Sequence, residues 1–304
     1  MKNRYVKQGM IKLCLLGLLT GCASAPVVEN DKYTGAQLND DFTDVLFATE
    51  LAVESEADAL ARAENALQAG NVEKALFFYT RALKYEPENV ETLAKIGAIQ
   101  FERNDYARAK QAFSLAKSFD PAHSASLEGL GLIYMAEGMN EQAIRELRAA
   151  IAYDSQLWRA HNALGIYADK SNNFAAALGH YDTALIINPN AADVLNNRGY
   201  SRFLAGDFPG ATADLYEAAN DRDFPSAWAN LGMVYAHHGW YDDAIWTYQN
   251  VMSDAHAYNN TGKIALKNGD FHQATWYLNE AIRRSPTYFP EAQQNLMRLE
   301  HLDR

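Results

Sequence analysis

Two stretches of the chain decide its fold: residues 162–184 read NALGIYADKSNNFAAALGHYDTA, and residues 196–218 read NNRGYSRFLAGDFPGATADLYEA. Aligned 34 residues apart, they share an asparagine, a glycine, a phenylalanine and two alanines at equivalent places. Small residues continue with this period in three series: Ala75, Ala109, Ala143, Ala177 and Ala211; Ala82, Ala116, Ala150, Ala184 and Ala218; and Gly97, Gly131, Gly165 and Gly199. Such a period indicates a repeat protein in which each repeat is one supersecondary unit.

The series continues with shorter spacings at Gly232 and Ala244 and then at Gly262 and Ala274, which predicts seven units. Their expected bounds are 56–89, 90–123, 124–157, 158–191, 192–224, 225–254 and 255–288, and a capping helix is expected over 289–304. Small residues at fixed places are typical of helices that cross closely, because larger side chains would overpack the contact. We therefore predict two helices per unit and an all-α fold.

Residues at the predicted turn of each unit support this division. Glycine or asparagine occupies every turn and favours a left-handed C-cap: Gly70, Asn104, Gly138, Asn172, Gly206, Gly239 and Gly269. An acid or an amide follows closely and is the expected N-cap of the second helix: Asn71, Asp105, Asn140, Asn173, Asp207, Asp242 and Asp270.

The units share a pattern with a known family. The sixth unit carries Trp228, Leu231, Gly232, Tyr235, Ala244 and Tyr248, and the fourth carries Leu164, Gly165, Ala177, Tyr181, Ala184 and Pro189. These residues resemble the tetratricopeptide repeat, whose pattern runs Trp, Leu-Gly, Tyr, then Ala, Phe or Tyr, Ala and Pro. The resemblance covers residues 56–288. It implies a right-handed solenoid of helix-turn-helix repeats whose first helices line a concave groove.

The beginning of the chain is typical of an export signal. Basic residues precede an apolar run over 13–20 that is too short to span a bilayer. Residues 19–22, LTGC, resemble the bacterial lipobox, which implies a signal peptide over 1–21 and a lipid on Cys22. Ala23 after this cysteine implies sorting to the outer membrane, on its periplasmic face, and residues 22–55 are expected to form an acidic tether with a short helix. The alternative is an ordinary secretory signal with an incidental cysteine.

Composition excludes several functions. With 38 acidic and 27 basic residues, the net charge of −11 disfavours a nucleic-acid partner. Cys14 and Cys22 are the only cysteines, so the repeats hold no disulfide or thiolate metal site. Neighbours such as His237 and His238 point about 100° apart on a helix, which disfavours a metal site there. The repeats and their flanks leave no room for a catalytic domain. We expect no enzyme activity, no small-molecule substrate and no cofactor besides the lipid on Cys22.

Candidate binding residues lie on the first helices. Asparagine recurs at positions expected to face the groove: Asn162, Asn196, Asn197, Asn230, Asn259 and Asn260. Its amide both donates and accepts, so a ladder of asparagines could hold the main chain of an extended peptide. The alternative is a merely polar surface. We expect replacement of Asn197, Asn230 and Asn260 by alanine to abolish binding at unchanged thermal stability.

Apolar and basic side chains accompany this ladder. Tyr200, Phe203 and Met233 are expected either to anchor a bound segment or to pack between repeats. Lys263 and Lys267 could hold a carboxylate such as a chain terminus, or could simply be solvated.

A narrower resemblance suggests a biological role. Residues 158–220 resemble the lipoprotein of the tight-adherence (Flp, type IVc) pilus apparatus, through HNALG at 161–165 and VLNNRGYS at 194–201. Arg198 departs from the apolar residue usual there. The resemblance implies a pilotin-like protein whose partner is the secretin or another pilus component. The alternatives are the pilotin of ordinary type IV pili and an envelope adaptor that recruits peptidoglycan enzymes.

Overall fold

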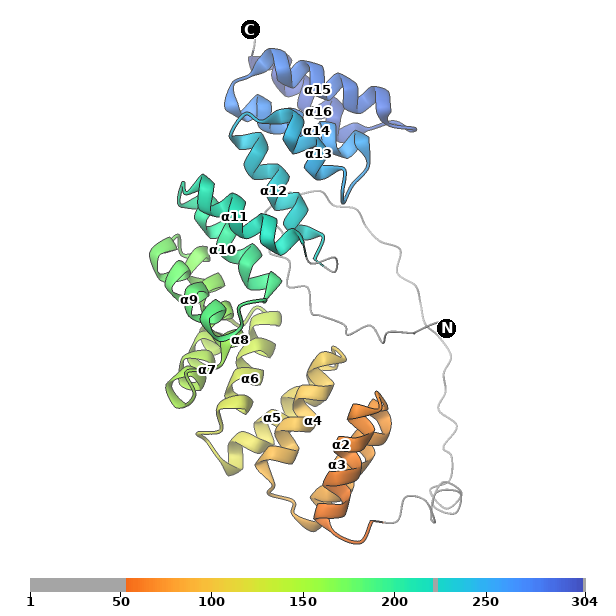
Figure 1. Cartoon of the computed structure of the whole chain (residues 1–304), viewed down its shortest axis with the longest axis vertical. Helices are drawn as coiled ribbons and strands as arrows, with labels where there is room; N and C mark the ends of the chain where they lie inside the picture. The colour runs from red at the N-terminus through yellow and green to blue at the C-terminus, as the bar shows by residue number, and fades with distance from the viewer. Residues whose placement is uncertain (1–52, 221–223, 303–304) are drawn as a thin grey trace. The chain divides into compact units, whose positions relative to one another are not determined.

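The computed structural model describes residues 53–220 and 224–302, so the predicted signal peptide, Cys22 and most of the tether lie outside the described residues. Within them the chain forms fifteen α-helices and no strand (Figure 1), which confirms the predicted all-α fold. The helices are α2 (Glu56–Gln68), α3 (Val72–Tyr85), α4 (Val90–Glu102), α5 (Tyr106–Phe119), α6 (Ser124–Ala136), α7 (Asn140–Tyr153), α8 (Trp158–Lys170), α9 (Phe174–Ile187), α10 (Ala192–Leu204), α11 (Phe208–Ala219), α12 (Ser226–His237), α13 (Tyr241–Tyr248), α14 (Asp254–Asn268), α15 (Phe271–Arg284) and α16 (Pro290–Leu302).

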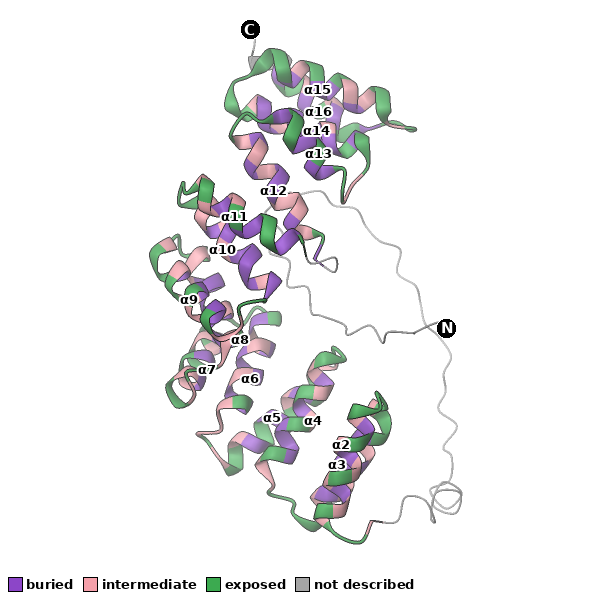
Figure 2. Ribbon diagram, in the orientation of Figure 1, coloured by how far each residue is buried: buried purple, intermediate pink, exposed green. Residues whose placement is uncertain are grey.

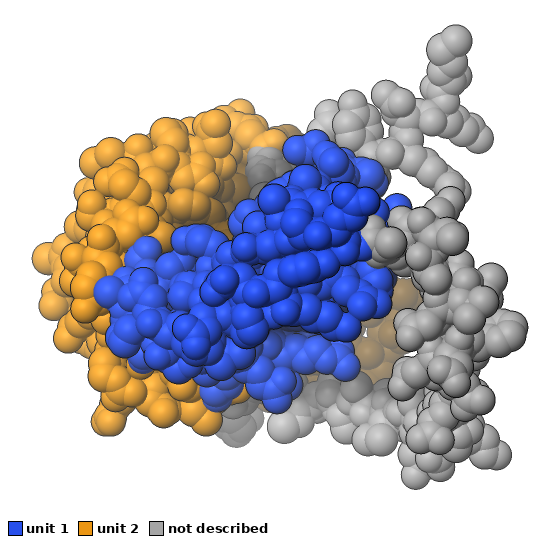
Figure 3. Space-filling model, turned by 90° about the horizontal axis from the view of Figure 1, so that it is seen from below, with its two compact units in different colours: residues 1–133 blue, residues 134–304 orange. Residues whose placement is uncertain are grey.

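The chain divides into two compact units between Ile133 and Tyr134 (Figure 3). In the first unit α2 packs on α3, and α4 packs on α5. In the second unit the packed pairs are α8 with α9, α10 with α11, α12 with α13 and α14 with α15, while α16 packs against both α14 and α15. Buried and exposed residues are interleaved along the helices (Figure 2), as expected for helices that each bury one face.

A glycine lets the two helices of a pair approach closely. A Cβ atom on Gly165 would lie 2.5 Å from Cε1 of Tyr181, and one on Gly199 would lie 2.8 Å from Cγ of Leu215. Both large side chains are fully buried. The same contact recurs with the same sequence separation at Gly97 with Phe113, Gly232 with Tyr248 and Gly262 with Leu278. The prediction that these small residues mark helix crossings is confirmed, because a larger residue would overlap the core side chain.

The turn residues also adopt the expected conformation. All seven have a positive φ, from 55° at Asn172 to 86° at Gly269. At Gly206 the turn closes with two hydrogen bonds, from Asp207 N to Arg202 O at 2.8 Å and from Gly206 N to Phe203 O at 3.0 Å. This is the Schellman pattern, which satisfies the last carbonyls of the first helix.

The predicted N-caps are partly wrong. Asn71, Asp105, Asn173 and Asp207 each accept a hydrogen bond from the backbone N–H three residues on. Asn140 and Asp242 do not cap their helices, because the cap position always directly follows the left-handed residue and is therefore Met139 or Trp240. Asp270 occupies the cap position, but its carboxylate accepts the hydroxyl of Tyr241 instead of a backbone N–H of its own helix.

Candidate peptide-binding surface of the second unit

Four of the predicted asparagines hydrogen-bond to one another from one repeat to the next. Asn197 Nδ2 on α10 donates to Asn162 Oδ1 on α8 at 3.0 Å, and Asn230 Nδ2 on α12 donates to Asn196 Oδ1 at 2.8 Å. Asn162 in turn donates to the carboxylate of Asp193 at 3.2 Å. We call Asn162, Asn196, Asn197 and Asn230 the amide ladder. It links three successive first helices.

The other two predicted asparagines lie on α14 and make different contacts. Asn259 Oδ1 accepts a hydrogen bond from Asn295 Nδ2 on α16 at 3.1 Å, and both residues are buried. Asn260 Nδ2 lies 3.4 Å from the sulfur of Met252. Sequence reasoning missed Asn295, although it follows Asn259 by 36 residues, close to the repeat period. Helix α16 therefore pairs with α14 as one first helix pairs with the next.

Burial changes what these amides can do. Asn196 and Asn197 are each 8% exposed and Asn259 is 7% exposed. Replacing Asn230 or Asn197 by alanine would leave a partner amide without its hydrogen bond, which costs about 1–3 kcal/mol for a buried group. These hydrogen bonds therefore predict that such variants lose thermal stability, contrary to the expectation from the sequence. Recognition of a peptide main chain by these residues stays a prediction.

The predicted aromatic residues form part of a larger group. The ring centroids of Tyr200 and Phe203 lie 6.2 Å apart, and Phe203 lies 5.1 Å from His237 and 5.8 Å from Phe208. Tyr200 and Phe203 are half-buried. Met233 is half-buried too, and it packs against the buried cluster that extends over α12 to α16. These side chains pack between repeats and still present part of their surface to solvent.

The two predicted lysines lie on α14 beside further cations. Lys263 is half-buried, and its pKa is lowered first by burial and then by the charges of Arg298 and Lys267. Burial also lowers the pKa of His237, with a contribution from Lys267. The sequence did not identify Arg298 as a member of this group, because it lies on the last helix outside the seven predicted units.

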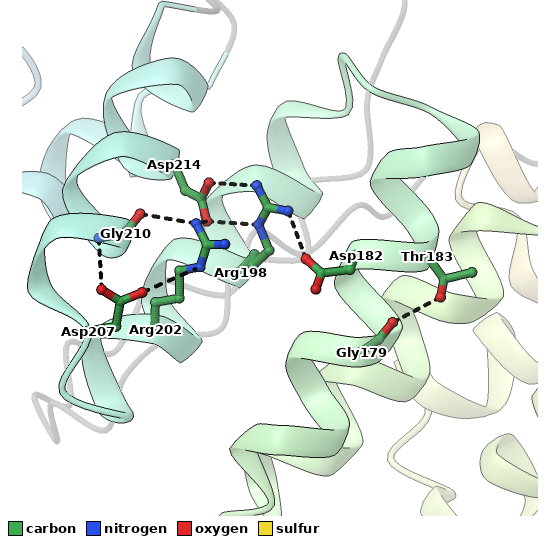
Figure 4. Close-up of polar contacts among 8 residues, drawn as sticks. All are labelled: Gly179, Asp182, Thr183, Arg198, Arg202, Asp207, Gly210 and Asp214. Atoms are coloured by element: carbon green, nitrogen blue, oxygen red, sulfur yellow. Dashed lines mark hydrogen bonds and ion pairs between the residues drawn. The ribbon is translucent and has the colours of Figure 1, made fainter.

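Arg198 is the centre of an ion-pair network (Figure 4). Its Nη2 lies 2.7 Å from Asp214 Oδ1 on α11, and its Nη1 lies 2.8 Å from Asp182 Oδ1 on α9. Arg202 Nη1 lies 2.8 Å from the other carboxylate oxygen of Asp214. Asp214 is only 3% exposed. Charge-assisted hydrogen bonds to a buried carboxylate are strong. Arg198 therefore joins the fourth repeat to the fifth by ion pairs.

A buried histidine and a half-buried one form a pair in the fourth repeat. The Nδ1 atoms of His161 on α8 and His180 on α9 lie 3.4 Å apart, and the buried Nε2 of His161 has no hydrogen-bond partner among the described residues. Burial lowers the pKa of both rings, and the neighbouring charges of His161 and Arg148 lower the pKa of His180 further. Neutral imidazoles therefore predominate at pH 7.

Over residues 53–220 and 224–302, no three or more His, Cys, Asp or Glu side chains gather as metal ligands would. None of the helices in these ranges has the length and hydropathy needed to cross a bilayer.

Family models agree with this architecture. Three models described as tetratricopeptide repeat match residues 66–133, residues 128–192 and 162–227, and residues 255–288. These matches extend over more than half of the chain. The chain belongs to the tetratricopeptide repeat family, whose fold is typical of non-enzymatic proteins that bind other proteins.

Sequence similarity to individual curated proteins extends over part of the chain. The chain is 33% identical over 121 residues to the type IV pilus assembly protein PilF of Pseudomonas aeruginosa, a match that covers 39% of this chain and 48% of PilF. It is 29% identical over 131 residues to a probable peptide N-acetylglucosaminyltransferase, SPINDLY, of Hordeum vulgare, covering 40% of this chain and 14% of that protein. The chain spans less than half the length of the curated relatives it matches.

Solved structures show the same fold. The structure of Pseudomonas aeruginosa PilF has a TM-score of 0.52 at 19% identity and covers 69% of this chain and 97% of its own. PilW, a type IV pilus biogenesis factor, has a TM-score of 0.55 at 22% identity and covers 68% of this chain and 98% of its own. At these identities the likeness establishes the repeat fold.

Proposed function

We propose that this protein is a non-enzymatic scaffold for pilus assembly that binds a segment of a protein partner on the first helices of its second unit. One observation carries the proposal: partly exposed aromatic side chains, Tyr200 and Phe203, stand beside a continuous amide ladder in a repeat protein similar to PilF. Aromatic anchors with adaptable polar neighbours are typical of protein-binding surfaces.

The proposal includes a lipid anchor. The lipobox-like residues 19–22 support acylation of Cys22 and attachment to the outer membrane, facing the periplasm. Several acyl chains on one residue would anchor the chain stably without a basic patch. A Cys22→Ser variant should lose incorporation of labelled fatty acid and leave the outer-membrane fraction. Unchanged labelling would contradict the anchor.

The type of pilus is a finer part of the proposal. The motifs at 161–165 and 194–201 support a pilotin-like role for the secretin of a tight-adherence pilus. The match to PilF supports a second candidate, assembly of a type IV pilus. In both cases the partner is a secretin or another pilus component.

Secretin multimers provide the test. Cells that lack the protein would receive the wild-type chain, a Tyr200→Ala/Phe203→Ala variant or, as a matched control, Tyr216→Ala on α11 of the same repeat, where the side chain is 54% exposed. We expect detergent-resistant secretin multimers with the wild type and the control, and few with the double variant. Full multimers without the protein would refute the assembly role. Loss of peptidoglycan enzymes from the envelope in those cells would favour the adaptor alternative.

A further inference from the structure

Helix α16 lies beside α14 in a defined register. The ring centroid of His256, in the first turn of α14, lies 4.9 Å from that of Phe289, which directly precedes α16. Further along both helices, Asn295, six residues after Phe289, donates to Asn259, three residues after His256. Two contacts in the same order along both helices mean that α14 and α16 run side by side in the same direction.

Three cations continue this register beyond the asparagine pair. Lys263 follows Asn259 by four residues, and Arg298 follows Asn295 by three residues. Residues three or four apart share one face of a helix, so both cations lie one turn beyond the pair. Lys267 adds a third cation one further turn along α14. We call Lys263, Lys267 and Arg298 the cation cluster. Burial and then the charges of Arg298 and Lys267 lower the pKa of Lys263, which agrees with the proximity of the three cations.

Among the described residues, no acid forms an ion pair with the cation cluster. By contrast, Arg283 and Arg284 on α15 are paired with Glu280 or Asp254 at 2.5–3.2 Å. Like charges at neighbouring helical positions are destabilising. In a chain of net charge −11, three cations from two helices that have no ion pair among the described residues are best explained by an anionic ligand.

This cluster adjoins the surface proposed to bind the partner. Asn268, next to Lys267, donates to the carbonyl oxygens of Ala236 and His237 at 3.1 and 3.4 Å. The ring of His237 contacts Phe203. A polypeptide on the aromatic residues of α10 could therefore extend over the end of α12 to the cations of α14 and α16.

We propose that the cation cluster binds the aspartate and glutamate side chains of an acidic segment in the protein partner, so that α16 is part of the binding surface. This proposal rests on the proposed function, because it requires a polypeptide on the adjoining surface. Three cations can neutralise more than the single charge of a chain terminus. An anionic lipid surface is a poorer match, because it would repel a chain with this net charge.

The test uses a random library of peptides that are acetylated at the N-terminus and amidated at the C-terminus, so that only side chains carry acid. The purified chain is immobilised, and retained peptides are sequenced. We expect aspartate and glutamate to be enriched by the wild type. In K263Q/K267Q/R298Q, binding of the selected acidic peptides should fall by about tenfold or more, as expected when charged hydrogen bonds are lost. In R298Q the loss of binding should be smaller. A K74Q/R81Q/K84Q variant removes three charges from α3 and should bind like the wild type.

Each other outcome has a distinct meaning. Acidic enrichment that persists in K263Q/K267Q/R298Q would overturn the proposal, as would retention that requires a free C-terminal carboxylate. Retention of neutral peptides that depends on Tyr200 and Phe203 would refute the cation cluster while leaving the proposed function standing. If no peptide were retained, the result would count against both the cation cluster and the proposed function. Binding of phosphatidylglycerol vesicles that is lost only in the triple variant of the cation cluster would assign the site to a lipid headgroup.

Discussion

Two helical glycines of the fourth repeat allow a matched test of the packing. Gly165 on α8 faces Tyr181, and a Cβ atom there would lie 2.5 Å from the ring. Gly179 on α9, whose carbonyl oxygen accepts the hydroxyl of Thr183 (Figure 4), would have no packing neighbour within 4 Å of its Cβ apart from its own helix backbone. Alanine is the better helix former at both places, by about 0.5–1 kcal/mol. The two substitutions therefore share the gain in helix propensity and differ in the clash.

The structure gives the expected size of that difference. Tyr181 is fully buried, and its hydroxyl donates to Asp169 at 2.8 Å, so the ring cannot simply move away. Overpacking a core of this kind costs about 1–3 kcal/mol. We expect Gly179→Ala to raise the free energy of unfolding by about 0.5–1 kcal/mol. The free energy of unfolding of Gly165→Ala should be about 1–3 kcal/mol lower than that of Gly179→Ala.

Urea unfolding followed by circular dichroism measures both variants on the same scale. Hydrogen exchange then locates the effect, because in stacked repeats a local fault should open its neighbours before distant repeats. Gly165→Leu should show this most clearly, with loss of protection concentrated in the helices next to α8. Equal stability of the two alanine variants, or uniform loss of protection along the chain in Gly165→Leu, would refute the reasoning.

Three further predictions concern polar groups of the second unit. Asp214→Asn should lower the free energy of unfolding by about 3 kcal/mol, because it leaves Arg198 without its buried counter-charge; a urea midpoint near that of the wild type would contradict this. Because burial lowers the pKa values of His161 and His180, the unfolded chain binds more protons, and stability should fall as the pH drops through the usual histidine value of 6.5 toward the lower folded values. His161→Leu should flatten this dependence in thermal melts at pH 7 and pH 5, and an unchanged slope would count against the role of this histidine pair. Asn230→Ala should cost about 1–3 kcal/mol by unpairing the amide of α10, so a variant as stable as the wild type would show that the ladder bond is not formed.

The repeat architecture could be read from the sequence because its causes are local and recur. The glycine at a crossing and the left-handed residue at a turn are each imposed by backbone geometry, so they reappear with a fixed period. Side-chain caps were less predictable. Met139 and Trp240 take the cap position because the turn places it there, whatever side chain the residue carries.

The candidate site was predictable only in part. Groove positions follow from the repeat register, and they identified the asparagines and Phe203. The hydrogen-bond partners of these asparagines could not be predicted from the sequence. The pairing of Asn196 with Asn230 and of Asn259 with Asn295 depends on how neighbouring repeats stack. Arg298 was missed because it lies on the last helix, outside the seven predicted units.

The central claim is that the first helices of the second unit bind a pilus component. A photo-crosslinking residue placed at position 200 on α10, in cells, tests it most directly, and the same residue at position 216 on α11 of the same repeat serves as the matched control. Both sites carry tyrosine in the native chain. The account predicts that position 200 captures a secretin or another pilus component, identified by mass spectrometry, and that position 216 does not. Capture of such a component only at position 216, or of a peptidoglycan enzyme at position 200, would contradict it.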